Sequence, residues 1–277
     1  MLVHYEGRLG IFDYDDQEFE VVNGKYYYGE ILHYIGNEVD GEKIIIPSGI
    51  KNCTEMFRDC NSLINPPKIP NGVIYCYGMF QDCTSLIIPP VIPDSVFYCE
   101  FMFQGCNSLI TPPKIPNGVV YCAYMFDRCT NLQIPPEIPK TAKDCYGMFE
   151  GCKSLEMPPE IPEGVENCGA MFNDCISLKY PPKIPNTVRD CTDMFWHCTS
   201  LITPPEIPAG TVRNYKNMFE DEPTLENFKD FNEFIIPNKF QSNLPIEVLR
   251  KFFEIPLLKA KNVKVEEMLM SIIHPKM

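Results

Sequence analysis

Seven tandem copies of one 23-residue unit occupy residues 46–206 of this 277-residue chain. Each copy follows the pattern I-P-x-x-V-x-x-C-x-x-M-F-x-x-C-x-S/N-L-x-x-P-P-x, with isoleucine or alanine at the valine position in two copies. A unit of this length cannot bury its apolar face alone and must stack on its neighbours. A degenerate eighth copy follows, in which Tyr215 and Glu222 replace the two cysteines. The sequence therefore predicts a solenoid.

The apolar positions inside each unit recur three or four residues apart. In the second copy they are Val73, Cys76, Met79, Phe80, Cys83 and Leu86. This spacing predicts a helix or a looser helical turn that faces inward with those six residues. The Pro89-Pro90 pair then forbids helix, and Ile92-Pro93 is expected to carry a short extended stretch. Because prolines lack an N–H, the parallel ladder between coils can only be short.

The order of these residues resembles the BspA-like leucine-rich repeats of bacterial surface proteins. The residues that carry the resemblance in the second copy are Val73, Met79, Phe80, Cys83, Leu86, Ile92 and Pro93. A second cysteine and the Pro-Pro pair depart from the family pattern. The resemblance covers about residues 46–228, and it implies an interaction protein without catalysis, exposed at a surface.

The fold class predicted is an α/β repeat solenoid, a leucine-rich-repeat-like right-handed coil stack with short extended stretches. Residues 1–45 alternate apolar and polar around Asn23-Gly24, which predicts a hairpin and an N-terminal β cap. The solenoid is assigned to residues 46–228. In residues 229–277, two amphipathic segments separated by Pro256 predict a C-terminal helical cap.

Charge and hydropathy exclude several kinds of partner. The net charge is −13 and no cluster of Lys and Arg could follow a phosphate backbone, so nucleic acid is not expected to bind. No apolar run is long enough to insert into a membrane. The start of the chain lacks a signal-peptide pattern, which predicts a cytoplasmic protein, or a cell-surface protein if the chain is a processed product.

The fourteen cysteines form two columns of seven, one at each cysteine position of the repeat. In a helix, a C-x6-C spacing separates the two Cα atoms by about 10 Å, too far for one tetrahedral zinc site or a disulfide within a repeat. Disulfides between stacked copies remain an alternative, since neighbouring coils lie within bridging distance. The favoured interpretation is that cysteine serves as a small buried hydrophobe. No metal site and no cofactor are expected.

No catalytic residue is predicted. The four histidines lie in different segments, and no nucleophile, phosphate-binding or metalloprotease motif is present. The one group that suggests catalysis is Trp196, His197 and Cys198. Adjacent residues of a helix point apart, so Trp196 and His197 are expected to lie on the surface of an outer turn.

The positions that vary around the first cysteine become aromatic in copies two to five. These candidate protein-binding residues are Tyr75, Tyr77, Phe97, Tyr98, Phe101, Tyr121, Tyr124 and Tyr146. A contiguous aromatic strip on a solvated face marks a contact surface, although rings that only pack on one another and cover the flank are the alternative. The competing surface is the extended side, with Ile64, Ile87, Ile88, Val91, Ile110 and Ile134 in early copies, and Glu137, Glu156, Glu160, Lys179, Lys183 and Glu206 in later ones.

These observations favour a non-catalytic protein-interaction or structural scaffold module with a protein partner. A surface adhesin or host-interaction protein is one alternative. A self-assembling structural component is another, because residues 1–45 hold ten acids against three bases while residues 235–277 hold seven bases against four acids. That charge difference would allow head-to-tail self-association.

Overall fold

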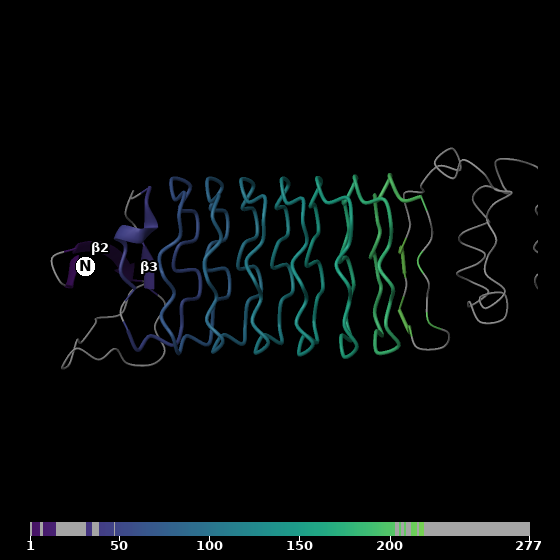
Figure 1. Ribbon diagram of the computed structural model, residues 1–277, viewed down its shortest axis with the longest axis horizontal. Helices are drawn as coiled ribbons and strands as arrows, with labels where there is room; N and C mark the ends of the chain where they lie inside the picture. Colours follow the sequence, from purple (N-terminus) through teal and green to yellow (C-terminus); the bar gives the residue numbers. More distant parts are fainter. Residues whose placement is uncertain are drawn as a thin grey trace, which may run out of the picture.

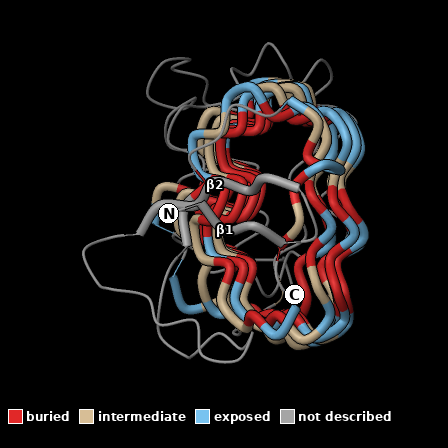
Figure 2. Tube along the Cα trace, turned by 90° about the vertical axis from the view of Figure 1, so that its left-hand side faces the viewer, coloured by how far each residue is buried: buried red, intermediate tan, exposed pale blue. Residues whose placement is uncertain are grey.

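The computed structural model describes residues 2–5, 8–14, 32–34, 39–46 and 48–202, together with residues 205, 208, 212–214 and 216–218. The repeats form coils that stack one behind another along the long axis (Figure 1). Seen along that axis, buried residues face the inside of each coil and exposed residues lie around its outside (Figure 2). The stacked-coil architecture predicted from the repeat period is confirmed.

A small antiparallel sheet lies at the N-terminal end of the stack (Figure 1). Its strands are β1 (Leu2–Tyr5), β2 (Arg8–Tyr14) and β3 (Leu32–Tyr34), in the order β1-β2-β3. β2 and β3 pair with Phe12 opposite Tyr34, so in sequence they flank the predicted Asn23-Gly24 turn. That turn and the predicted C-terminal helices lie outside the described residues.

The stacked core begins ahead of the first recognisable repeat. The ring of Tyr34 lies 5.4 Å from that of Phe57, the position it would hold in a preceding copy. Its N–H donates to the Met56 carbonyl, just as the Phe57 N–H donates to the Met79 carbonyl. A 3-10 helix, η1 (Gly41–Lys43), follows, and the side chain of Asp40 caps it. The segment predicted as a cap thus also supplies part of a coil.

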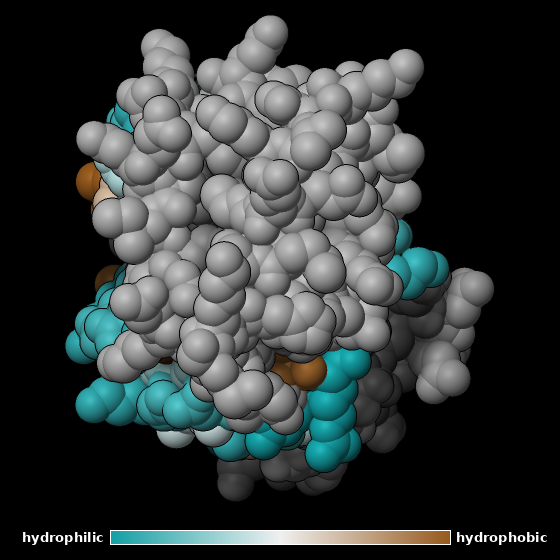
Figure 3. Space-filling view, turned by 90° about the vertical axis from the view of Figure 1, so that its right-hand side faces the viewer, coloured by the Kyte–Doolittle hydropathy of each residue, from teal (hydrophilic) through white to brown (hydrophobic). Residues whose placement is uncertain are grey.

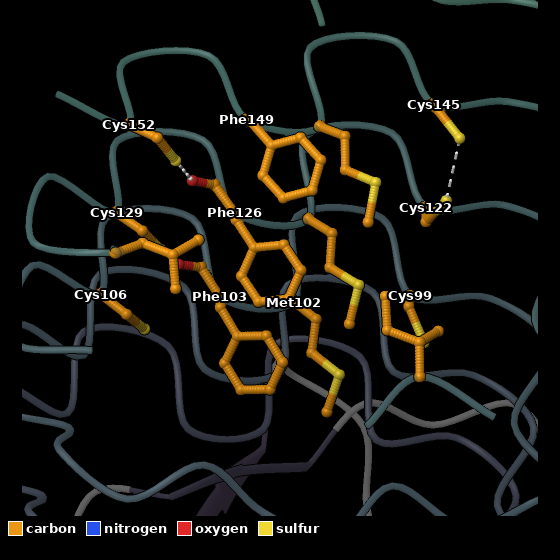
Figure 4. Packing of buried hydrophobic residues seen from close by; sticks show 14 of the residues in the cluster. Cys99, Met102, Phe103, Cys106, Cys122, Phe126, Cys129, Cys145, Phe149 and Cys152 are labelled. Atoms are coloured by element: carbon orange, nitrogen blue, oxygen red, sulfur yellow. Dashed lines mark hydrogen bonds between the residues drawn. The ribbon is translucent and has the colours of Figure 1, made fainter. Parts of the chain in front are cut away.

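The six positions predicted to face inward are buried. In the second copy Val73, Cys76, Met79, Phe80, Cys83 and Leu86 are all 0% exposed. The phenylalanines from Phe57 to Phe195 form one column with centroids 5.5–5.8 Å apart and planes within 11° of parallel. Figure 4 shows this column flanked by the two rows of cysteines.

Of the two conformations predicted for this segment, the helix is wrong and the looser turns are present, and the inward-facing residues are as predicted. In residues 76–86 the chain forms successive turns, and among the described residues η1 is the one helical element. The spacing of the coils gives the reason: rings of neighbouring coils are less than 6 Å apart, whereas an α-helix with its side chains is about 10 Å wide. One helix per coil does not fit.

Alternate N–H groups of this segment bond to different partners. The N–H of Phe80 donates to Met102 of the next coil at 2.9 Å, while the N–H of Gln81 closes a turn onto Gly78 at 3.0 Å. Gly78, Asp82 and their equivalents in the other copies adopt left-handed backbone, which bends the chain at two points per coil. The segment therefore satisfies its backbone groups partly within the coil and partly between coils.

The parallel ladder between coils is as short as predicted but lies elsewhere. Single-residue bridges join Asn52 to Tyr75 and continue through each coil to the Asp190–Asn214 pair, at the residue before the first cysteine. The extended stretch at Ile92-Pro93 was expected to carry the ladder. Prolines there lack an N–H, so bonds between coils on this side are few, such as that from the Ile87 N–H to the Ile64 carbonyl at 3.1 Å, and the continuous row of bridges lies on the other side of the coil.

Candidate functional site

Two sides of each coil differ in backbone and in side chains. We call the turn side the eight residues from the one before the first cysteine to the one before the second, residues 75–82 in the second copy and the equivalents in the other six. The rest of each coil, which carries the Pro-Pro and Ile-Pro pairs, is the proline side. The predicted aromatic residues lie on the turn side or immediately before it.

The structure brings the aromatic residues together in two rows, which together form the aromatic strip. In the first row the rings of Tyr75, Tyr98 and Tyr121 stack 4.9 and 5.2 Å apart. Phe97 packs against this row, 5.0 Å from Tyr98. The residues before the first cysteine form bridges between coils, so the backbone itself holds these rings in register.

The second row lies two or three residues further along each coil. Tyr77 and Phe101 are 5.1 Å apart, Phe101 and Tyr124 are 4.8 Å apart, and Tyr124 and Tyr146 are 5.3 Å apart. The Tyr124 hydroxyl also hydrogen-bonds that of Tyr146, and burial is the main cause that raises the pKa of Tyr124. All eight predicted residues therefore contact at least one other member of the strip.

The rings are packed on one another and remain open to solvent. Tyr75, Tyr77, Phe97 and Tyr121 are 38–42% exposed, and the other four are half-buried. Stacking between coils gives the strip a structural role, because each ring covers part of the next. The exposed fraction leaves a contiguous apolar surface across copies two to five.

Two of the rings are held on an unfavourable backbone. Phe101 and Tyr124 have φ values of 59° and 56°, in the left-handed region. Gly78 and Gly147 occupy the same place in the copies on either side. A bulky residue there costs about 1–2 kcal/mol, and such strain clusters at functional sites. The same left-handed position holds Glu55, Ala170 and Asp193 in the other three copies, so this backbone belongs to every coil and is not particular to the rings.

Small residues in the following copies make room for the last rings of the strip. A Cβ on Gly147 would lie 2.5 Å from the ring of Tyr124, and one on Gly169 would lie 2.6 Å from the ring of Tyr146. The rings of Tyr124 and Tyr146 therefore lie over the backbone of these two glycines, and any side chain at either glycine would displace a ring.

Outside the strip, Asn or Asp replaces the tyrosine of the first row. The side chains of Asn52, Asp144, Asn167 and Asp190 each accept the N–H two residues further on, at 2.8–3.0 Å. Tyrosine cannot close this local turn. The sequence analysis did not predict this bond, although a column of Asn and Asp at a turn is the signal for it.

A column of polar side chains runs beside the second row. Gln81 donates to Gln104 and Gln104 to Asp127, each at 2.6 Å. The next member of the column is Glu150. Burial, followed by the nearby charges of Asp127 and Asp174, raises the pKa of Glu150 to about 7. Burial also raises the pKa of Asp127 above its ordinary value, opposed by the hydrogen bond from Gln104.

This pKa makes stability depend on pH. Between its ordinary value of about 4.5 and about 7, Glu150 is protonated in the folded protein and ionised in the unfolded chain. Its contribution to stability is therefore complete below pH 4.5 and is lost as the pH rises through 7. We expect Glu150→Gln to raise the free energy of unfolding at pH 8 by about 1 kcal/mol, after discounting for partial exposure, and to change little at pH 4.5.

Urea unfolding of the two proteins at several pH values measures this difference. The control is Glu156→Gln, since Glu156 is exposed and pairs with Lys179 on the proline side. An equal benefit from Glu150→Gln at both pH values would show that Glu150 does not titrate in this window.

All fourteen cysteines are free thiols, and all except Cys60 are buried. In the second column each thiol from Cys83 onward donates to the carbonyl of the phenylalanine in the preceding coil, as Cys152 does to Phe126 at 3.2 Å (Figure 4), and Cys60 donates to the Tyr34 carbonyl. Burial raises the pKa of Cys53 and of Cys191 to about 12. These thiols pack and satisfy carbonyls, and none is activated as a nucleophile.

Trp196 and His197 do not point apart, because the segment is not a helix. The indole N–H donates to Nε2 of His197 at 2.9 Å, and Nδ1 of His197 lies 2.9 Å from Oδ1 of Asp174. Both imidazole nitrogens therefore have partners on the protein surface. The Cys198 thiol is buried and bound to the Phe172 carbonyl, so this trio holds no nucleophile and base in contact.

The part of the chain that the structure describes shows neither a metal-binding cluster nor a membrane-spanning helix. No three or more His, Cys, Asp or Glu side chains there are grouped to hold a metal ion. No helix among the same residues has the length and hydropathy needed to span a membrane.

The proline side also exposes apolar residues. Val91 is 87% exposed, and Ile134, Ile88, Ile87, Ile110 and Ile64 are 37–59% exposed, as the sequence predicted. A shallow groove of about 370 Å³ lies between the third and fourth copies, lined by residues that include Pro113, Ile134 and Pro136. From the end where the last coils lie, the visible described residues are mostly hydrophilic, with isolated hydrophobic ones (Figure 3).

Four solved structures are similar to this chain, and they are described as leucine-rich repeat or leucine-rich proteins. One from T. pallidum is 20% identical, with 71% of this chain and 80% of that chain covered and a TM-score of 0.41. One from Bacteroides ovatus is 20% identical, with 76% and 67% covered and a TM-score of 0.43. A cell surface protein from Faecalibacterium prausnitzii is 22% identical, with 58% of each chain covered and a TM-score of 0.40.

A search of protein-family profiles finds no match, and neither does a search of curated proteins. At these identities and TM-scores, the assignment of the fold rests on the stacked coils themselves.

Proposed function

We propose that this chain is a non-catalytic protein-interaction or scaffold module that binds a protein partner through the aromatic strip. The observation that carries the proposal is the strip itself. Its eight rings are contiguous across copies two to five, and four of them are at least 38% exposed. Tyr and Phe anchors of this kind supply most of the energy in typical interfaces.

The stack suits a scaffold because every coil is bonded to the next. Backbone hydrogen bonds between coils recur from Tyr34 to Asn214. A surface mounted on such a stack stays in place when a partner binds, which lowers the entropic cost of association.

The test replaces Tyr98 and Tyr121 together by serine. We expect the double variant to lose capture of the partner from a lysate of the source cell, as measured by affinity capture and mass spectrometry. Its melting temperature should fall by only a few °C, since both rings lie at the surface and the core column is untouched. The matched control is Ile88→Ser with Ile134→Ser, which removes two residues of the proline side that are 53% and 59% exposed.

Two results would contradict the proposal. Capture that persists while the protein melts many degrees lower would show that the rings only cover the flank of the solenoid. Capture that is lost with the isoleucine pair and kept with the tyrosine pair would move the binding surface to the proline side.

A further inference from the structure

Charge is divided unequally between the two sides of the coils. Over the seven copies the proline side is balanced, with seven acids against nine bases. The turn side holds ten acids and two bases, Arg58 and Arg128. The ten acids are Glu55, Asp59, Asp82, Glu100, Asp127, Asp144, Glu150, Asp174, Asp190 and Asp193. The aromatic strip therefore lies on a strongly acidic side of the solenoid.

The basic residues of the turn side are already paired. Arg58 contacts Glu55 at 2.8 Å and Asp59 at 3.6 Å, and Arg128 contacts Asp127 at 3.3 Å. Among the described residues, no Lys or Arg forms a salt bridge with Glu100, Asp144 or Glu150. These three carboxyls remain available for a cation from outside.

Unsatisfied polar atoms also lie on this side. Among the residues that the structure describes, four buried side-chain oxygens lack a partner, and all four belong to the turn side: those of Glu100, Asn173, Thr192 and Asp193. Glu100 stands within the strip, one residue before Phe101, and burial raises its pKa above the ordinary value. An ionised carboxyl with an unsatisfied oxygen is stabilised by a charged donor.

We propose that the partner presents an extended segment rich in Lys and Arg to the aromatic strip. This inference rests on the proposed function and adds the chemical class of the partner. The aliphatic stems of the basic residues lie against the exposed rings, and their charged heads reach Glu100, Asp144 and Glu150. Charge complementarity of this kind selects a basic partner and speeds its association.

The spacing of the carboxyls defines the spacing of the cations. Glu100 belongs to the third copy, whereas Asp144 and Glu150 belong to the fifth. Stacked rings of successive copies are 4.8–5.8 Å apart, so two coils span about 10–12 Å along the stack. In a polyproline II segment, residues i and i+3 project from the same face about 9 Å apart. Basic residues at every third position therefore match the strip.

The probe is a fluorescein-labelled nonapeptide with Lys at every third position and Pro between, and its binding to the full chain is measured by fluorescence anisotropy. We expect micromolar binding that weakens at least tenfold between 50 and 300 mM salt. The same peptide with Glu in place of Lys should not bind. Glu100→Gln with Glu150→Gln should raise Kd at least tenfold, and so should Tyr98→Ser with Tyr121→Ser.

The matched control is Glu156→Gln with Glu160→Gln, which removes the same charge from two exposed residues of the proline side. It should change Kd less than twofold, and all variants should remain folded at the temperature of the binding measurement. An equal loss in this control, equal binding of the Glu peptide, or self-association of the chain through the strip would overturn the proposal. If the Lys peptide does not bind while lysate capture still needs Tyr98 and Tyr121, the proposed function stands and the basic partner is wrong.

Discussion

Phe126→Ala is expected to lower the free energy of unfolding by about 3–5 kcal/mol. The ring is 0% exposed and lies between those of Phe103 and Phe149, at 5.6 and 5.8 Å. The coils on both sides are each hydrogen-bonded to the coil that holds Phe126, so they cannot collapse into the space the ring leaves. The variant therefore loses both the transfer free energy of the ring and its packing contacts.

Urea unfolding followed by circular dichroism measures the change. Ile134→Ala is the control, because Ile134 is 59% exposed and a surface substitution changes stability by about 0.5 kcal/mol or less. A cost for Phe126→Ala below about 1.5 kcal/mol would mean that the stack can close over the missing ring. The corresponding residue of the degenerate copy, Phe219, lies outside the described residues.

Gly41→Ala is expected to destabilise the N-terminal end of the stack by about 1–3 kcal/mol through overpacking. A Cβ at this buried glycine would meet backbone of the next coil, namely the Asn65 carbonyl oxygen and, at 2.6 Å, the Pro67 nitrogen. Neither atom can rotate away as the end of a side chain can. The Gly41 N–H also donates to Asn65 at 2.9 Å, so the two coils cannot separate without losing that bond.

The comparison is Gly49→Ala. Gly49 has a φ of 92° and a Cβ there meets nothing within 4 Å, so that variant reports the backbone cost alone. Hydrogen exchange at the amides of Tyr34 and Gly41 should accelerate in Gly41→Ala, because the first coil opens before the rest. Equal stability of the two variants would show that the first coil is not held against the second as the structure has it.

Much of the architecture follows from the repeat. The period predicted the stack, and the apolar positions predicted which six residues of each coil face inward, because inward positions repeat whatever the local backbone does. The same frame located the aromatic residues, which the structure places in contact. The unequal charge of the two sides was also readable from the sequence, by counting charges separately for each stretch of the repeat, but composition over the whole chain conceals it.

Other features required the structure. Spacings of three and four residues fit a helix and a series of turns equally well, so the sequence could not choose between them. The coil formed by Tyr34 has no cysteine and no Met-Phe pair to mark it. The contact of His197 with Trp196 and Asp174 joins two coils through left-handed residues, which no pattern of residue types specified.

The sequence by itself determined the register of this protein: which residues of each coil meet their equivalents in the next, since a fixed period aligns them. The tertiary structure decided the local conformation. The backbone N–H groups of residues 76–83 bond either within their own turn or to the neighbouring coil. Coils less than 6 Å apart leave no room for a helix. That choice depends on contacts between residues about 22 positions apart, which local propensity does not contain.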